Sequence, residues 1–231
     1  MSVLGAAVSP EQLMRTMVAT VGHELRTPLT SIRGYLETLL EGGLDAATVR
    51  RFLETARREA LRLGRLVDGM LAFSPLDVSR HAPSASCDAP EQVRATIEML
   101  EPLAAERGVT IHNECCDELS VRIDADAFVH ALANLVENAI KHGGADGTIE
   151  LRCSGDEQWV TTSVEDDGGG IAPSQQETIF SFGVSSARSG SFGSGIGLAV
   201  VRAIAERAGG DVCVEPSPLG GARFVLRLPA G

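Results

Sequence analysis

Apolar side chains at the N-terminal end of the chain follow the spacing of an amphipathic helix. They recur at steps of three, four and seven, at Leu13, Met17, Val21, Ile32, Leu36, Leu39 and Leu40. Ser9 can cap the start of this helix, and Pro10 suits its first helical position. Gly42 and Gly43 follow Glu41 and favour a helix end there. The pattern therefore predicts one long helix from about residue 10 to residue 41.

A second helix is expected directly afterwards, from Asp45 to about Ala72. Its apolar stripe consists of Phe52, Ala56, Leu63, Val67 and Met70. Two helices joined by a short turn cannot bury both stripes against each other alone. We therefore expect a second copy of the chain to complete a four-helix bundle, which makes the protein a homodimer.

The pattern changes after this hairpin. Prolines and serines mark a linker over residues 77–88, with Pro75 just before it and Pro90 just after it. Beyond it, helical periodicity predicts helices over residues 90–107, 124–142 and 197–208. Alternating positions predict short strands over 109–113 and 119–123 around a polar turn, then strands over 148–153 and 160–165 and two more between 211 and 229. Helices on one face of a mixed sheet make an α+β layered domain over residues 89–231.

Composition narrows the function classes. The chain of 231 residues has a formal net charge of −11, so it repels phosphate backbones and nucleic acid is not an expected partner. The five cysteines are scattered, and Cys115 and Cys116 are adjacent, so we expect neither a disulfide scaffold nor a zinc site. The sequence has no apolar run of the roughly 18–20 residues that a membrane span needs, and no basic signal-peptide start. These features favour a cytoplasmic protein, either soluble or a fragment of a larger one.

The heptapeptide His-Glu-Leu-Arg-Thr-Pro-Leu at residues 23–29 interrupts the first helix. Pro28 removes a ladder hydrogen bond and should kink the helix just past His23. An unprotonated imidazole is a competent nucleophile near neutral pH, and Glu24 beside it could orient the ring or accept its proton. For a lone histidine, a plain surface position on a bundle helix would be the better interpretation.

A second pattern lies within the predicted helix over residues 124–142. Asn134, Asn138 and Lys141 fall at i, i+4 and i+7 and so share one helix face. Amide side chains and a lysine suit a triphosphate with its hydrated Mg²⁺, which takes few protein ligands. An ordinary solvated polar face is the competing interpretation.

Two glycine-rich segments follow. Asp166 begins the first, directly after a strand, and Gly168 and Gly170 permit close backbone approach there. The second is Gly193-Ser194-Gly195-Ile196-Gly197-Leu198, which opens a helix and exposes backbone amides to phosphate. Either segment alone is weak evidence, since an acidic turn or a dinucleotide site could look similar.

In their order along the chain, these four patterns resemble the H, N, G1 and G2 boxes of sensor histidine kinases, over roughly residues 10–228. The resemblance implies a dimerisation and histidine phosphotransfer domain over 9–76 and a catalytic ATP-binding domain over 89–231, an α/β sandwich of the Bergerat ATPase type. It implies autophosphorylation of His23 from Mg·ATP and transfer to an aspartate on a response regulator receiver domain.

The resemblance also assigns site residues. Asn138 would be the Mg²⁺ ligand, with Asn134, Lys141 and His142 near the phosphates, and Asp166 would recognise adenine. Water-hydrolysing relatives carry a glutamate one turn before the magnesium asparagine. Here that position is Asn134, so the site is expected to hold ATP for an external nucleophile.

The segment between the glycine boxes resembles an ATP lid. Its single basic residue, Arg188, could reach the γ-phosphate or could be a solvated loop residue. Phe180 and Phe182 resemble an F-box, but the family usually separates these aromatics by two residues instead of one. They could equally be core residues at the base of the lid.

Glu24 and Thr27 match the pattern that accompanies phosphatase activity toward the partner, although Thr27 could simply pack beside Pro28. Two other functions remain open. A degenerate kinase could dock a response regulator without phosphorylating it. The F-box with one residue instead of two between its aromatics favours that interpretation. A Bergerat protein could phosphorylate serine on a partner, as anti-sigma kinases do, but those proteins lack a hairpin with an H-box.

Overall fold

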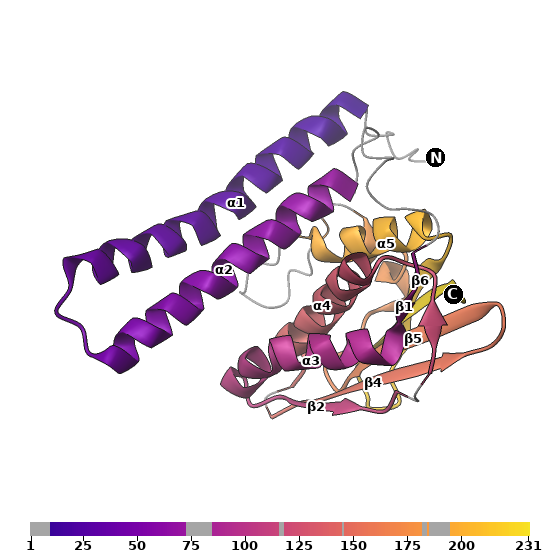
Figure 1. Ribbon diagram of the computed structural model, residues 1–231. Coiled ribbons are helices and arrows are strands. Elements are labelled where there is room, and N and C mark those ends of the chain that lie inside the picture. The colour runs from indigo at the N-terminus through magenta and orange to yellow at the C-terminus, as the bar shows by residue number, and fades with distance from the viewer. Residues whose placement is uncertain (1–9, 73–84, 116–117, 145, 182–183, 185–194) are drawn as a thin grey trace.

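The computed structural model describes residues 10–72, 85–115, 118–144, 146–181, 184 and 195–231. For residues 10–21, 23, 24, 62 and 65–72 it describes the backbone alone. Two parts are visible, a long helical hairpin and a layered domain of helices and strands (Figure 1). Both predicted fold classes are therefore confirmed.

The hairpin consists of α1 (Pro10–Glu41) and α2 (Ala46–Ala72). Helix α1 continues through Pro28, which is buried. Gly42 and Gly43 adopt φ of 75° and 79° in the turn, a conformation that favours glycine. Asp45 begins α2 as expected, because its Oδ1 accepts from the backbone N–H of Thr48 at 2.9 Å. No helix in the described part of the chain is both long enough and apolar enough to cross a membrane.

The second part is a five-stranded mixed sheet with helices on one face. Its helices are α3 (Ala89–Glu106), α4 (Ala125–His142) and α5 (Gly197–Arg207). Its strands, in spatial order, are β2 (Thr110–Asn113), β4 (Thr148–Gly155), β5 (Trp159–Asp166), β7 (Ala222–Pro229) and β6 (Asp211–Pro216). Two short 3₁₀ turns, η1 (Pro173–Gln175) and η2 (Thr178–Phe180), follow β5. Aliphatic side chains of the helices and of alternate strand positions fill one core between the layers.

The strands that were predicted over residues 109–113 and 119–123, on either side of a polar turn, belong to different sheets. β2 pairs in parallel with β4, whereas β3 (Ser120–Val121) pairs with β1 (Cys87–Asp88) in a separate two-stranded sheet.

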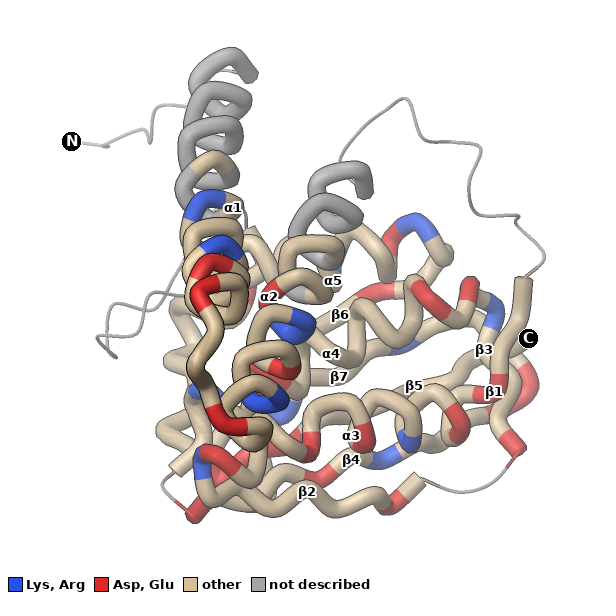
Figure 2. The backbone as a smooth tube through the Cα atoms, turned by 60° about the vertical axis from the view of Figure 1, so that its left-hand side comes forward, with Lys and Arg blue, Asp and Glu red and all other residues tan. Residues whose placement is uncertain are grey.

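The hairpin lies against the layered domain in both views, with α2 beside α5 (Figures 1 and 2). Nη1 of Arg58 on α2 lies 2.8 Å from Oε1 of Glu106 on α3. Leu25 of α1 packs against the core of the layered domain. Figure 2 shows mainly basic positions along the described part of α2 and mainly acidic positions along α3, which suits contacts of this kind.

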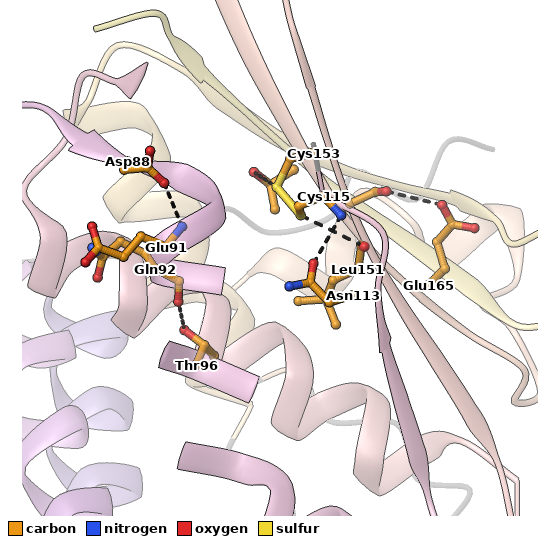
Figure 3. Close-up of a disulfide and its surroundings, with 11 residues drawn as sticks. Asp88, Glu91, Gln92, Thr96, Asn113, Cys115, Leu151, Cys153 and Glu165 are labelled. Carbon is orange, nitrogen blue, oxygen red and sulfur yellow. Dashed lines mark hydrogen bonds between the residues drawn. A yellow bond between two sulfur atoms is a disulfide. The ribbon is translucent and has the colours of Figure 1, made fainter. Parts of the chain in front are cut away.

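Cys115 and Cys153 form a disulfide, which corrects the expectation of unpaired thiols (Figure 3). Their Cα atoms lie 4.4 Å apart, within the range that a disulfide can bridge. Cys115 follows edge strand β2, and Cys153 lies in the neighbouring strand β4. The parallel pairing of these strands brings together two cysteines whose spacing along the chain gave no such signal.

Candidate functional site

Helix α4 buries one face in the core and leaves a second, polar face only half-buried. Its first turn is capped by Asp124, whose Oδ1 accepts from the backbone N–H of Ala127 at 3.1 Å. The buried face is formed by Phe128, Ala131, Leu132, Leu135, Val136 and Ala139. Asn134, Asn138 and Lys141 are only half-buried, as the helical spacing predicted. Nδ2 of Asn134 donates to the backbone oxygen of His130 at 2.9 Å, which orients the amide.

The second glycine segment lies against this face. A Cβ on Gly197 would be 2.8 Å from Oδ1 of Asn134, so the start of α5 lies directly against this amide, which would have to shift to admit a side chain. Gly195 adopts φ of 62°, and among the described residues no side chain makes a capping hydrogen bond at the N-terminus of α5. The first turn of α5 therefore presents backbone N–H groups next to the amides of α4. Leu198 packs against the core behind them.

Asp166 ends β5 and is almost fully buried, with 3% of its surface exposed. Its Oδ1 accepts from the backbone N–H groups of Gly168 at 2.9 Å and Ala222 at 3.1 Å. Burial raises the pKa of this carboxyl above its ordinary value, although both N–H donors act in the opposite direction. No hydrogen bond among the described residues uses Oδ2, so this oxygen can accept from a ligand.

The loop after Asp166 packs directly on the end of α4. A Cβ on Gly168 would collide with the backbone oxygen of His142. Gly170 adopts φ of 64° beside the backbone oxygen of Gly221, another position that requires glycine. Burial, and then the charge of Lys141, lower the pKa of His142 below its ordinary value. His142 therefore carries a neutral imidazole near pH 7.

Asp167 lies next to Asp166, and its sequence position alone did not mark it as a site residue. Its Oδ2 accepts from the backbone N–H of Thr148 at 2.8 Å, and its Oδ1 from that of Gly144 at 3.4 Å. The available signal was a second acid directly after Asp166, followed by glycines. Its partners lie some twenty residues earlier in the chain, so their proximity was not visible in the sequence.

Not every predicted site residue falls within the described part of the chain. Arg188, Gly193 and Phe182 lie outside it. Phe180 is buried at the end of η2, where its ring meets that of Phe224 edge-on at 6.2 Å. The guanidinium carbon of Arg202 lies 4.8 Å from the Phe180 ring centre. Phe180 is thus a core residue of the layered domain, as the second interpretation of this aromatic pair predicted.

The H-box residues, 23–29, lie on α1. His23 and Glu24 are helical, and Thr27 is exposed. Leu25, between them, packs against the core of the layered domain. The turn of α1 that carries His23 is therefore next to that domain.

Two family models match the chain. The His Kinase A (phospho-acceptor) domain matches residues 13–78, and the histidine kinase-, DNA gyrase B- and HSP90-like ATPase matches residues 123–231. The chain belongs to the histidine kinase family. The first match covers the helical hairpin of this histidine kinase, and the second covers most of its layered domain.

Curated relatives agree with this assignment. The sensor-like histidine kinase SenX3 of Mycobacterium tuberculosis (strain ATCC 25618 / H37Rv) is 34% identical over 224 residues, which cover 95% of this chain and 55% of that protein. The sensor histidine kinase WalK of Bacillus subtilis (strain 168) is 31% identical over 226 residues, covering 95% of this chain and 37% of that protein. The chain thus spans about half the length of its curated relatives, or less.

Solved structures share the architecture of this histidine kinase. Full-length ShkA in complex with AMPPNP has a TM-score of 0.65 at 28% identity, covering 97% of this chain and 46% of that one. Histidine kinase ThkA in complex with response regulator protein TrrA has a TM-score of 0.62 at 25% identity, covering 94% and 61%.

The residues on α4 fit the magnesium ion that the family implies. Asn138 offers one half-buried amide oxygen on the face shared with Asn134 and Lys141. Mg²⁺ at a nucleotide site takes one or two protein ligands and completes its octahedron with phosphate oxygens and water. A single amide between a second amide and a lysine is consistent with that requirement.

Proposed function

We propose that this chain binds Mg·ATP in its layered domain and transfers the γ-phosphoryl group to its own His23. The observation that carries the proposal is the convergence of three separate segments on one corner. Gly197 at the start of α5 contacts Asn134, and Gly168 beside Asp166 contacts the end of α4 at His142. An adenine acceptor, two amides and a helix N-terminus therefore lie within one site.

Each end of the nucleotide has its own set of residues. Oδ2 of Asp166 accepts a hydrogen bond from the adenine amino group, and Gly168 and Gly170 let the loop approach the ring. The backbone N–H groups of the second glycine segment bind phosphate oxygens beside the polar face of α4. Those phosphate-side residues are Asn134, Lys141, His142, Arg188, Gly193, Gly195, Gly197 and Leu198.

Asn138 holds Mg²⁺, which supplies charge neutralisation at the β- and γ-phosphates. In the transfer, a nitrogen of His23 attacks the γ-phosphorus and forms a P–N bond. The bond from phosphorus to the bridging oxygen breaks, ADP leaves, and Glu24 accepts the imidazole proton. Asn134 cannot act as a base toward water, so the site favours the histidine as nucleophile over hydrolysis.

The phosphohistidine then passes its phosphoryl group to an aspartate of a response regulator. The complex of ThkA with TrrA, a response regulator protein, supports this class of partner. The chain acts as a cytoplasmic homodimer, with residues 9–76 as the dimerisation and phosphotransfer domain, 77–88 as linker and 89–231 as the catalytic domain. Glu24 and the exposed Thr27 position a water for dephosphorylation of the same partner.

The test is autophosphorylation of the purified chain with Mg²⁺ and γ-labelled ATP. His23→Gln is compared with His112→Gln, which removes an exposed histidine from edge strand β2. We expect acid-labile, base-stable label on the wild type and on His112→Gln, and none on His23→Gln. Acid-stable label would instead indicate serine phosphorylation, and clear ATP binding without label would indicate a docking module.

A further inference from the structure

The carboxylate of Asp167 connects two segments of the nucleotide corner that are distant in sequence. Asp167 directly follows β5, whereas its backbone donors are Gly144, in the loop between α4 and β4, and Thr148, the first residue of β4. Thr148 donates to Oδ2 at 2.8 Å and Gly144 to Oδ1 at 3.4 Å. One side chain thus accepts from both ends of that loop.

The loop is shaped around this carboxylate. A Cβ on Gly147 would lie 2.8 Å from Oδ1 of Asp167, and one on Gly143 or Gly144 would lie 3.8 Å from it. At Gly147 any other residue would force the carboxylate or the loop to move. The backbone oxygen of Gly147 also accepts from the N–H of Thr110 at 2.9 Å, which ties the loop to the sheet. Gly147 therefore lets the chain approach Asp167 closely, whereas a Cβ on Gly143 or Gly144 would make only an ordinary van der Waals contact with it.

The anchored loop leads directly from the last turn of α4. That turn carries Lys141 and His142, and Gly143 caps it with an N–H bond to the oxygen of Ala139 at 2.7 Å. On the other side, Asp167 is bonded to Asp166 through the backbone. The carboxylate therefore links the segment that follows α4 to the segment that carries the adenine acceptor.

We infer that Asp167 is a positioning residue for nucleotide binding, which holds the end of α4 and Asp166 at the separation that ATP requires. The inference rests on the proposed function and assigns a role to a residue that touches neither the adenine nor the phosphates. A charged acceptor with two amide donors is a strong local anchor, and small displacements of binding groups weaken a bound ligand many-fold.

A matched control exists at the opposite end of β5. Oδ1 of Asp156 accepts from the backbone N–H groups of Gln158 and Trp159, each at 2.8 Å. Asp156 thus makes the same kind of contact in the same domain, in the turn between β4 and β5. Asp156→Ala removes this comparable anchor far from Asp166, whereas asparagine there would keep the one oxygen that accepts both bonds.

The experiment compares Asp167→Asn and Asp167→Ala with Asp156→Ala in the full chain. We would measure the Kd of a fluorescent ATP analogue with Mg²⁺, the Tm, and the KM and kcat of His23 labelling. We expect Asp167→Asn to raise Kd and KM about tenfold with kcat changed less than about threefold. Asp156→Ala is expected to lower Tm about as much as Asp167→Ala does and to leave Kd within about twofold of wild type.

A wild-type Kd in Asp167→Asn would overturn the inference and leave the proposed function standing, as would an equal loss of affinity in Asp156→Ala. Asp167→Ala removes both acceptor oxygens, so its affinity should be lower still. Failure of the wild-type chain to bind the analogue would overturn the proposed function, and this inference with it.

Discussion

At the scale of single residues, the proposed nucleotide site contains glycines at which an added Cβ would press on a neighbouring atom. At Gly197 the atom nearest to an added Cβ is Oδ1 of Asn134, at 2.8 Å. That oxygen is the end of a flexible side chain, so it can move without disturbing the backbone. A methyl group at Gly197 should therefore displace the amide of Asn134 and leave the fold intact.

Gly197→Ala is expected to weaken ATP binding about fivefold or more, since Asn134 would no longer lie at the first turn of α5. The Tm should stay the same or rise slightly, because alanine has the higher helix propensity at this helical position. Titration with a fluorescent ATP analogue, alongside thermal unfolding, measures both effects.

Gly169→Ala is the matched control for that variant, because a Cβ there meets nothing within 4 Å. It should leave the affinity unchanged. Equal affinities for wild type and Gly197→Ala would show that the contact between α5 and Asn134 does not contribute to binding.

At the scale of elements, the weakest part of the sheet is edge strand β2, which has four residues and a single partner strand. Two features hold the chain that leaves it. The backbone N–H of Glu114 donates to the oxygen of Leu151 at 2.8 Å, and Cys115 is bonded to Cys153 of β4. Figure 3 shows this bond beside Asn113 and Leu151. The disulfide therefore adds a covalent link between β4 and the segment after β2, at an edge where the sheet has few hydrogen bonds.

Cys115→Ser should lower the free energy of unfolding by about 2–4 kcal/mol under non-reducing conditions, because the bond closes a loop of 38 residues in the unfolded chain. The difference should disappear in excess dithiothreitol. Urea unfolding with and without the reductant measures it.

Cys213→Ser provides the control, since Cys213 is an exposed free thiol on β6. It should have little effect in either condition. If thiol counting on the unfolded, non-reduced wild type finds Cys115 and Cys153 both reactive, the expected stabilisation is wrong.

At the scale of the whole molecule, the hairpin exposes apolar side chains that a single chain leaves uncovered. On α1, Leu29, Leu36 and Leu40 are 57%, 45% and 87% exposed and share one helix face. On α2, Leu53 and Leu61 are 51% and 44% exposed. A second copy of the hairpin can bury both sets in a four-helix bundle.

Replacing Leu36 and Leu53 together by glutamate should convert the dimer to a monomer, because four carboxylates would then enter the apolar centre of the bundle. Light scattering coupled to size-exclusion chromatography gives the mass. Both side chains are exposed in the single chain, so the circular dichroism of the layered domain should not change.

Leu219→Glu alters a comparably exposed leucine, 36% exposed, in the turn between β6 and β7. It should remain dimeric. A wild-type chain that is already monomeric at micromolar concentration would contradict the prediction of a bundle.

Local patterns in the sequence determined which segments are helices and strands. The helix over 125–142 was predictable because its period of apolar positions is a property of neighbouring residues, as is the shared face of Asn134, Asn138 and Lys141. The caps at Asp45 and Asp124 are likewise local, since each accepts an N–H three residues ahead. The order of the boxes was enough to indicate the family.

Contacts between distant segments were decided only by the tertiary structure. Asp166 accepts from Ala222, Asp167 from Thr148, and Asn134 meets Gly197, none of which are neighbours in the sequence. The partner of β2 and the pairing of Cys115 with Cys153 belong to the same group. Each depends on how the sheet is ordered and how the helices pack on it. Burial of the whole core determines that arrangement, and no single segment contains the information for it.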